Sequence, residues 1–167
     1  AINKGTINID FGSWSGSNFT GNETKTSQSV VISDSNNTLS GLATSLSAIS
    51  GVNATVIDKG DGTFSLIVNS DTGANNALRL GVTEDENDPG LISFDTSSTN
   101  ASKQVVAAQD ASMTINGVQV TRASNTITDL IDGYEFKLNT TTTSAASVIA
   151  SIDSDLAYST VKGFVDM

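Results

Sequence analysis

Apolar residues recur every three or four positions between Thr38 and Ser50, which is the spacing of one face of an amphipathic helix. Polar residues at 35–38 offer candidate helix N-caps, and Gly51 follows at the place where a helix C-cap is favoured. The sequence therefore predicts a helix over 38–50. Its apolar stripe consists of Leu39, Leu42, Ala43, Leu46 and Ile49.

Alternating apolar and polar residues, the period of a half-buried β-strand, mark most other regular segments. Strands are predicted over 5–11 and 28–33, joined by a long loop or irregular hairpin connection over 12–25 that is rich in glycine and polar residues. A hairpin is predicted over 52–69, because Gly60 and Gly62 mark a turn between two alternating segments.

One more strand is predicted over 78–82, which completes the order strand, strand, helix, strand, strand, strand. The simplest packing of these elements is one antiparallel sheet with the helix on its apolar face. An acidic, turn-rich segment follows over 83–99, and we expect a domain boundary near residue 105.

The rest of the chain is predicted to be mostly strand. Asn116-Gly117 lies between two alternating segments and is a strong hairpin signal, because type I′ turns need positive φ at both central residues. A second turn is predicted at Asp132-Gly133, and 144–152 is compatible with a last strand. Acidic N-cap residues then precede a helical pattern over 153–167.

These patterns predict a predominantly β, α+β fold with two small antiparallel-sheet domains, the first with one packed helix, and a C-terminal helix stub. The predicted domains are 1–105 and 106–152, followed by the helix start at 153–167. The second domain has fewer than about fifty residues and no disulfide, too few for a core that stands alone. It is expected either to pack against the first domain or to take strands from sequence upstream.

Composition narrows the function classes. The net charge is −10, and the eight basic residues are scattered singly, which disfavours nucleic-acid and anionic membrane partners. Cysteine and histidine are both absent, which excludes disulfide frameworks, thiol nucleophiles and imidazole bases. No cofactor is expected. Because the first residue is Ala1 rather than Met, we interpret the chain as part of a longer protein.

Two acidic segments are candidate metal sites. Asp58 to Gly62 resembles the start of a calcium loop, but ligand positions 3, 5 and 12 would be Gly60, Gly62 and Asn69, which favours a hairpin turn. The segment 84–88 has four carboxylates, so it would be either a weak divalent-cation site or a solvated loop, and the loop is favoured. Neither segment has the paired, rigidly held acids of a glycosidase, and no enzyme activity is expected.

One aromatic pair is a candidate partner or glycan contact. Trp14, the only tryptophan, lies in the glycine- and serine-rich loop with Phe19 nearby. An aromatic on a loop can stack on a sugar ring or anchor a partner. The alternative, which we favour, is that the pair folds back over the edge of its own core.

Two blocks carry a family resemblance. They are TLSGLATSLSAISGVNATVIDKGDGTFSLIVNSDTGANNALRL, from Thr38 to Leu80, and AQDASMTINGVQVTRASNTITDLIDGYEFKLN, from Ala108 to Asn139. Their order and spacing, with the closing stretch 151–167, resemble the middle of the flagellar hook-associated protein 2 family, the flagellar filament cap. The motif residues that carry the resemblance are turn and core positions: Leu39, Leu42, Leu46, Gly60, Gly62, Asn116 and Gly117.

The resemblance implies a structural and assembly role in the exposed head of the cap. Several copies would form a ring at the filament tip and promote flagellin polymerisation, with hook–filament junction proteins as further partners. It also implies an extracellular location reached through the flagellar export channel. The second domain would be discontinuous, with the first inserted in it, and the last helix would begin an α-helical leg with coiled coil in the full-length protein. The alternative function is a surface adhesin that binds host mucin or glycans through Trp14 and Phe19.

Overall fold

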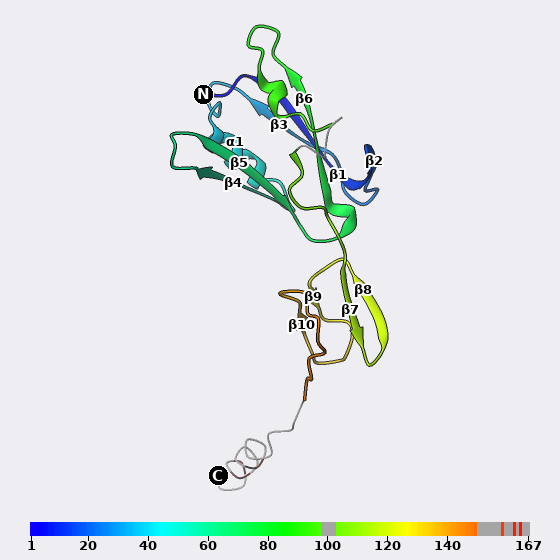
Figure 1. The fold of residues 1–167 in the computed structure, drawn as a ribbon. Coiled ribbons are helices and arrows are strands. Elements are labelled where there is room, and N and C mark those ends of the chain that lie inside the picture. The colour runs from blue at the N-terminus through cyan, green and yellow to red at the C-terminus, as the bar shows by residue number, and fades with distance from the viewer. Residues whose placement is uncertain (98–102, 150–157, 159–161, 163, 165–167) are drawn as a thin grey trace.

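The computed structural model describes residues 1–97 and 103–149, together with Tyr158, Lys162 and Phe164 (Figure 1). The helix predicted over 153–167 lies outside the described residues apart from those three, all of which are exposed. Within the described part of the chain, no helix is long and apolar enough to cross a lipid bilayer.

A four-stranded antiparallel sheet is built around β1 (Gly5–Ser15), which pairs with each of the other three strands. These are β2 (Asn18–Gly21), β3 (Gln28–Ile32) and β6 (Ala77–Glu84), the last of which follows the short helix η1 (Ala74–Asn76). The apolar side chains at alternate positions of β1, Ile7, Ile9 and Phe11, are buried. The predicted alternation over 5–11 is therefore confirmed.

The segment 12–25, expected to be a long loop or an irregular hairpin connection, is largely a hairpin. β1 continues to Ser15 and turns back into β2, so that Trp14 pairs with Phe19. The short polar residues here have low strand propensity. The cross-strand contact between Trp14 and Phe19 stabilises this hairpin, which its short polar residues alone would not.

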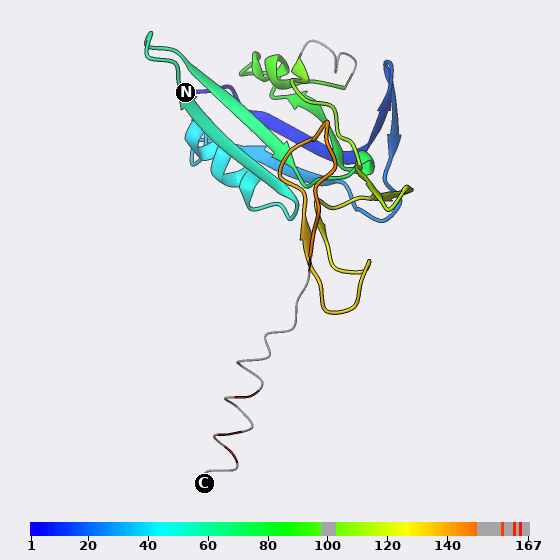
Figure 2. The same cartoon turned by 60° about the horizontal axis from the view of Figure 1, so that its bottom comes forward.

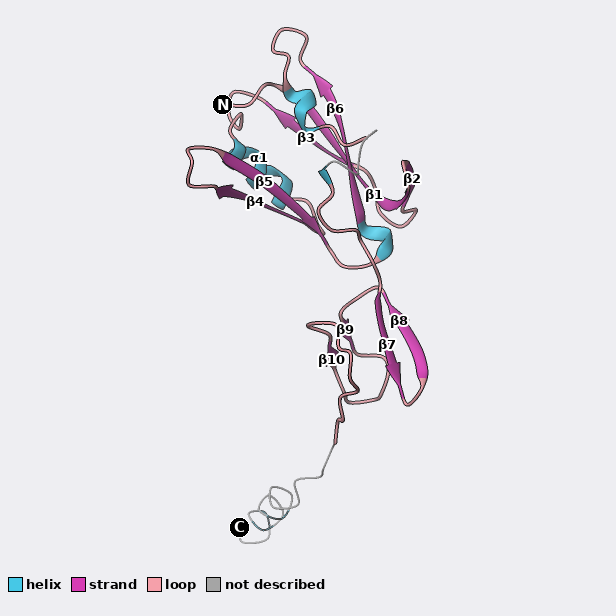
Figure 3. Cartoon of the chain, in the orientation of Figure 1, coloured by secondary structure: helices cyan, strands magenta, loops and turns pink. Residues whose placement is uncertain are grey.

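The prediction of a single sheet for the first part of the chain is wrong. β4 (Val52–Asp58) and β5 (Phe64–Ser70) pair only with each other, as a separate two-stranded ribbon. Helix α1 (Leu39–Ser47) runs beside β4, as Figure 3 shows, and Ala54, Leu66 and Val68 of the ribbon pack on the same core as the larger sheet. The alternation in β4 and β5 was read correctly, but alternation does not say which strand will be a neighbour.

α1 is shorter than predicted. The Thr38 hydroxyl caps it by accepting from the Gly41 N–H at 2.9 Å, and the helix ends at Ser47, with Gly51 at φ 80° after the turn that follows. Leu42 and Leu46 are completely buried, whereas Leu39 at the first turn is only half-buried.

The core lies between the larger sheet and a cover made of α1, the β4–β5 ribbon and the short helix η2 (Leu91–Phe94). Leu91 is completely buried although it comes from the segment predicted to be acidic turns. The buried cluster is Ile7, Ile9, Phe11, Val30, Ile32, Leu42, Leu46, Val52 and Leu91.

Residues 103–149 form two further hairpin-like pairs, which lie below the first part in Figure 1. β7 (Ala111–Ile115) pairs with β8 (Val118–Arg122), and β9 (Thr126–Ile127) pairs with β10 (Phe136–Lys137). Asn116 and Gly117 have φ of 50° and 85°, which confirms the predicted turn. Gly133, at φ 83°, lies in the second predicted turn.

The last strand predicted, over 144–152, does not form in its described part. Residues 144–149 are in irregular structure, and Val148 and Ile149 are 76% and 88% exposed. A β-compatible sequence forms a strand only when another strand pairs with it, because its backbone groups need partners.

Candidate interaction surfaces

Trp14 and Phe19 face each other near the tip of the β1–β2 hairpin, one residue pair before its turn. The two rings meet edge to face, with centroids 4.9 Å apart, and the Trp14 Nε1–H donates to the Leu78 carbonyl at 3.2 Å. Both side chains are half-buried. Gly12 makes room for this arrangement, since a Cβ at this position would lie 2.1 Å from the Thr20 carbonyl oxygen and 2.7 Å from Phe19.

An arginine covers one face of the Phe19 ring. The Arg79 guanidinium lies 4.5 Å from the ring centroid and forms an ion pair with Asp10 at 2.7 Å. Burial opposes ionisation of Asp10, but hydrogen bonds from Ser27 and Arg79 more than offset it and lower the pKa of this carboxyl. The rings thus contact their own sheet, which favours the interpretation that they cover it. A role in partner or glycan binding stays a prediction.

The Asp58–Gly62 segment is the turn of the β4–β5 hairpin, as predicted. Gly60 and Gly62 have φ of 78° and 83°. Asp58 accepts from the Gly60 N–H at 2.8 Å, and Asp61 accepts from the Thr63 N–H at 2.9 Å. Each carboxylate therefore binds its own turn. Nowhere in the described part of the chain do three or more potential metal-ligating side chains gather.

The acidic segment 84–88 organises the turn after β6. Glu84 accepts from the Gly90 and Ile92 N–H groups at 2.6 and 2.8 Å, which positions η2 beside the sheet. Hydrogen bonds from the Ile92 and Gly90 backbone lower the pKa of this carboxyl. Asp88 accepts from the Asn3 side chain and the Lys4 backbone, and these bonds lower its pKa as well. The loop interpretation is supported, with the addition that these carboxylates hold it in place.

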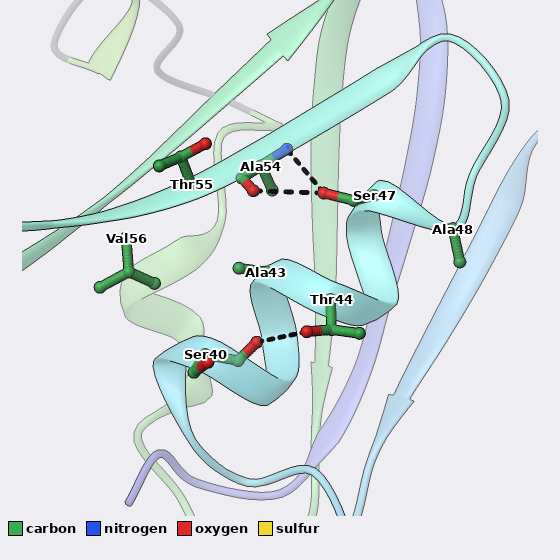
Figure 4. A pocket seen from close by; sticks show the side chains of 8 residues that line it. All are labelled: Ser40, Ala43, Thr44, Ser47, Ala48, Ala54, Thr55 and Val56. Atoms are coloured by element: carbon green, nitrogen blue, oxygen red, sulfur yellow. Dashed lines mark hydrogen bonds between the residues drawn. The ribbon is translucent and has the colours of Figure 1, made fainter.

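A shallow groove runs between α1 and the edge of β4 (Figure 4). The Ser47 hydroxyl occupies one end, where it accepts from the Ala54 N–H at 2.9 Å and donates to the Ala54 carbonyl at 3.2 Å. The groove is lined by small side chains and one valine: Ser40, Ala43, Thr44, Ser47, Ala48, Ala54, Thr55 and Val56. Such a lining leaves the backbone of β4 accessible beyond Ser47.

A second hollow lies where the two parts of the chain meet. Its lining comes from the end of β5 and the η1 turn on one side and from Ala123 and Ser124 on the other. The Asp110 carboxylate accepts from the Ala74 N–H at 2.7 Å, and Gly73, at φ 111°, approaches Ala123 closely. Between residues 1–97 and 105–149, this is the only described hydrogen bond, so the junction is narrow.

Sequence reasoning missed several residues that shape these surfaces. Arg79, Ser47 and Asp110 act on residues 69, 7 and 36 positions away along the chain. None of these three residues belongs to a motif or a periodic pattern that would mark it in the sequence. Trp14 and Phe19, which did stand out, are brought together as expected from their proximity.

Comparison with known proteins identifies the fold. The family model described as "Flagellar hook-associated protein 2 C-terminus" matches residues 108–167. The crystal structure of the D2-D3 domains of the flagellar cap protein FliD from Escherichia coli is 33% identical, with a TM-score of 0.64, and the match covers 86% of this chain and 69% of that one. The chain belongs to the flagellar hook-associated protein 2 family.

The chain spans less than half the length of longer relatives that it matches. The E. coli FliD structure of domains D1-D2-D3 is 31% identical with a TM-score of 0.72, covering 99% of this chain but 46% of that chain. The curated flagellar hook-associated protein 2 of E. coli K12 is 41% identical over 101 residues, which are 59% of this chain. The match spans 22% of the length of that relative.

Proposed function

We propose that this chain is the head region of a flagellar filament cap, a structural and assembly protein that acts outside the cell at the filament tip. The observation that carries the proposal is the match to the D2-D3 domains of a flagellar cap protein at 33% identity over 86% of the chain. The parent protein would form a ring of several copies that promotes flagellin polymerisation and contacts the hook–filament junction proteins.

The proposed mechanism is mechanical rather than catalytic. The heads form a plate at the growing end, and the α-helical legs, which would begin near residue 153, guide flagellin subunits into place. The candidate acids support a non-catalytic role, because Asp58, Asp61 and Glu84 are engaged by hydrogen bonds from nearby backbone groups. A strongly negative chain also keeps separate copies apart until assembly brings them together.

The proposed domain organisation follows the same family. Residues 1–105 form an inserted outer head domain, and 106–152 form part of a discontinuous domain completed by strands from upstream sequence. Two observations support this division. The family model begins at residue 108, and the apolar face of β7 and β8 is only half-buried in the described chain.

Complementation tests the proposed function. The full-length parent gene is placed in a motile bacterium that lacks its own cap, and a cognate flagellin is supplied. Filament length and flagellin lost to the medium are then compared with the strain carrying an empty vector. We expect restored filaments and little leakage.

Export and folding of the parent protein are checked by immunoblotting and limited proteolysis. Continued leakage from cells that export a folded protein would contradict the cap function. An adhesin role would then be tested on a glycan array with Trp14→Ala as the matched variant.

A further inference from the structure

The β4–β5 ribbon is nearly uncharged in a strongly acidic chain. Each strand has seven residues, and Asp58, at the turn end, is the only charged residue in either. The whole chain carries a net charge of −10. Two copies that approach one another through this ribbon are therefore repelled less than they would be at the acidic loops, such as 84–88.

Two other strand edges in this part of the molecule carry local hydrogen-bond partners. Along β6, the Leu80 and Val82 N–H groups donate to Thr96 Oγ1 at 2.9 Å and Asp95 Oδ2 at 2.8 Å. At β3, the Asn36 side chain donates to the Val31 carbonyl at 2.9 Å. Such contacts prevent unwanted strand addition, which is the usual hazard of an exposed sheet edge.

The outer edge of β5 has no such cover. Ser47 binds both backbone groups of Ala54, so these point away from β5. In an antiparallel ladder the orientation alternates, so the N–H and C=O groups of Phe64, Leu66 and Val68 point away from β4. Among the described residues, no hydrogen-bond partner is found for any of them.

The same half of the ribbon exposes apolar side chains. Phe64, Ile57 and Ile67 are 54%, 44% and 42% exposed, and they lie toward the turn that joins the two strands. An uncharged, apolar strand with an open edge and no proline is an efficient template for another strand. The β4 edge across the ribbon is open beyond Ser47, where the groove of Figure 4 is lined by small side chains.

We propose that the β5 edge of one copy pairs with the β4 edge of a second copy. The added strand runs antiparallel to β4 and enters the groove beside Val56, where Ser40, Ala43 and Thr44 leave room for its backbone. Because the two edges lie on opposite sides of one ribbon, the contact is head to tail, which is the kind of contact that closes a ring. This inference rests on the proposed function for the identity of the partner.

Backbone blocking tests the pairing in the full-length parent protein. Phe64→Pro removes the outward N–H at the first residue of β5, a position where proline is tolerated, and leaves the ladder to β4 intact. Phe64→Ala is the control, since it removes the same side chain and keeps the N–H. By sedimentation velocity, we expect proline to weaken self-association about tenfold and alanine no more than about threefold.

Urea unfolding of the 167-residue chain with each substitution, followed by Trp14 fluorescence, checks that both variants remain folded. Equal association of the proline and alanine variants would overturn the proposal. A different outcome would refute both proposals: neither the variants nor the wild-type parent associates, and the wild type does not complement. The proposed cap function would then be wrong as well as the β5–β4 pairing. If the wild-type parent complements normally but Phe64→Pro does not weaken self-association, the proposed cap function stands and only the β5–β4 pairing is refuted.

Cross-linking provides a second, independent measurement, because this chain has no cysteine. Ile67→Cys is placed in one population of the parent and Ile57→Cys or Thr55→Cys in another, with any other cysteine of the parent replaced by serine. We expect disulfide-linked dimers in the mixtures and not in either population alone. Dimers of Ile67→Cys alone would show symmetric β5–β5 pairing and overturn the head-to-tail contact, as would the absence of any cross-link.

Discussion

The two parts of this chain have similar strands and turns but bury very different amounts of apolar surface. Of the buried apolar residues in the described chain, eleven lie in 1–97 and two, Ala111 and Ile127, in 103–149. In the first part, α1, the ribbon and η2 cover one face of a sheet. In the second part, Ala111 is buried, but the other apolar side chains on its face of the β7–β8 hairpin are half-buried or exposed: Met113, Ile115, Val118 and Val120. Strand pairing alone does not make a core.

Separating the two parts should have the largest effect. We expect 1–105 to fold alone and 106–152 to remain largely unfolded, because a two-stranded hairpin without a covered face is marginal in water. Amide chemical-shift dispersion in ¹⁵N–¹H NMR spectra measures both. Well-dispersed signals from the isolated 106–152 would contradict this account of the comparison.

A core truncation compares the parts within one chain. Leu46→Ala removes a completely buried side chain, and we expect a loss of about 2–5 kcal/mol in the free energy of unfolding. Urea unfolding followed by Trp14 fluorescence reports on this part alone, because Trp14 is the only tryptophan. The matched change Val120→Ala, on the half-buried face of β8, should cost less than about 1 kcal/mol by circular dichroism.

The proposed upstream strands give a sharper form of the same comparison. If they cover the β7–β8 face, Val120→Ala should cost about 1–3 kcal/mol in the full-length protein, more than in the 167-residue chain. Calorimetry of both proteins measures the difference. Equal costs would mean that this face stays open in the parent and that the discontinuous domain is completed elsewhere.

A glycine pair tests the β1–β2 hairpin. Gly12→Ala places a methyl group 2.1 Å from the Thr20 carbonyl, and we expect a loss of about 1–3 kcal/mol. At Gly21, its cross-strand partner, a Cβ would have no heavy atom of another residue within 4 Å, so Gly21→Ala should change stability by less than about 0.5 kcal/mol. Urea unfolding of both variants measures these changes in the free energy of unfolding. Similar losses in the two variants would show that strand propensity, and not the close contact with Thr20, determines the cost.

Acid should weaken the first part before it affects the second. Hydrogen bonds lower the pKa values of Glu84, Asp88, Asp10 and Asp95 in the first part, and an ion pair with Arg122 lowers the pKa of Asp129 in the second. A lowered folded pKa adds stability above the unfolded pKa, near 4, and this is lost as pH falls through the folded pKa.

Unfolding followed by Trp14 fluorescence between about pH 5 and pH 2 should show this loss. Glu84→Gln should make the pH dependence shallower. Glu86→Gln is the control, since no described hydrogen bond reaches that side chain. A Glu84→Gln curve that overlays the wild type would refute the role of the Gly90 and Ile92 contacts.

Local patterns predicted the elements well. The period of Leu42 and Leu46 indicated α1, the alternation of Ile7 and Ile9 indicated β1, and Asn116-Gly117 indicated the β7–β8 turn. Each depends on residues a few positions apart, so the sequence contains the information directly. The same blocks indicated the family, which the comparisons confirm.

Contacts between distant segments had to come from the fold. Among the described strands, β4 and β5 pair only with each other and pack beside α1, where Ser47 binds Ala54. Leu91 is buried in η2, whose first turn Glu84 holds. The open edge of β5 and the half-covered face of β8 depend equally on what lies next to them. Period and propensity describe one strand at a time, whereas the neighbour of a strand is chosen by packing across the whole core.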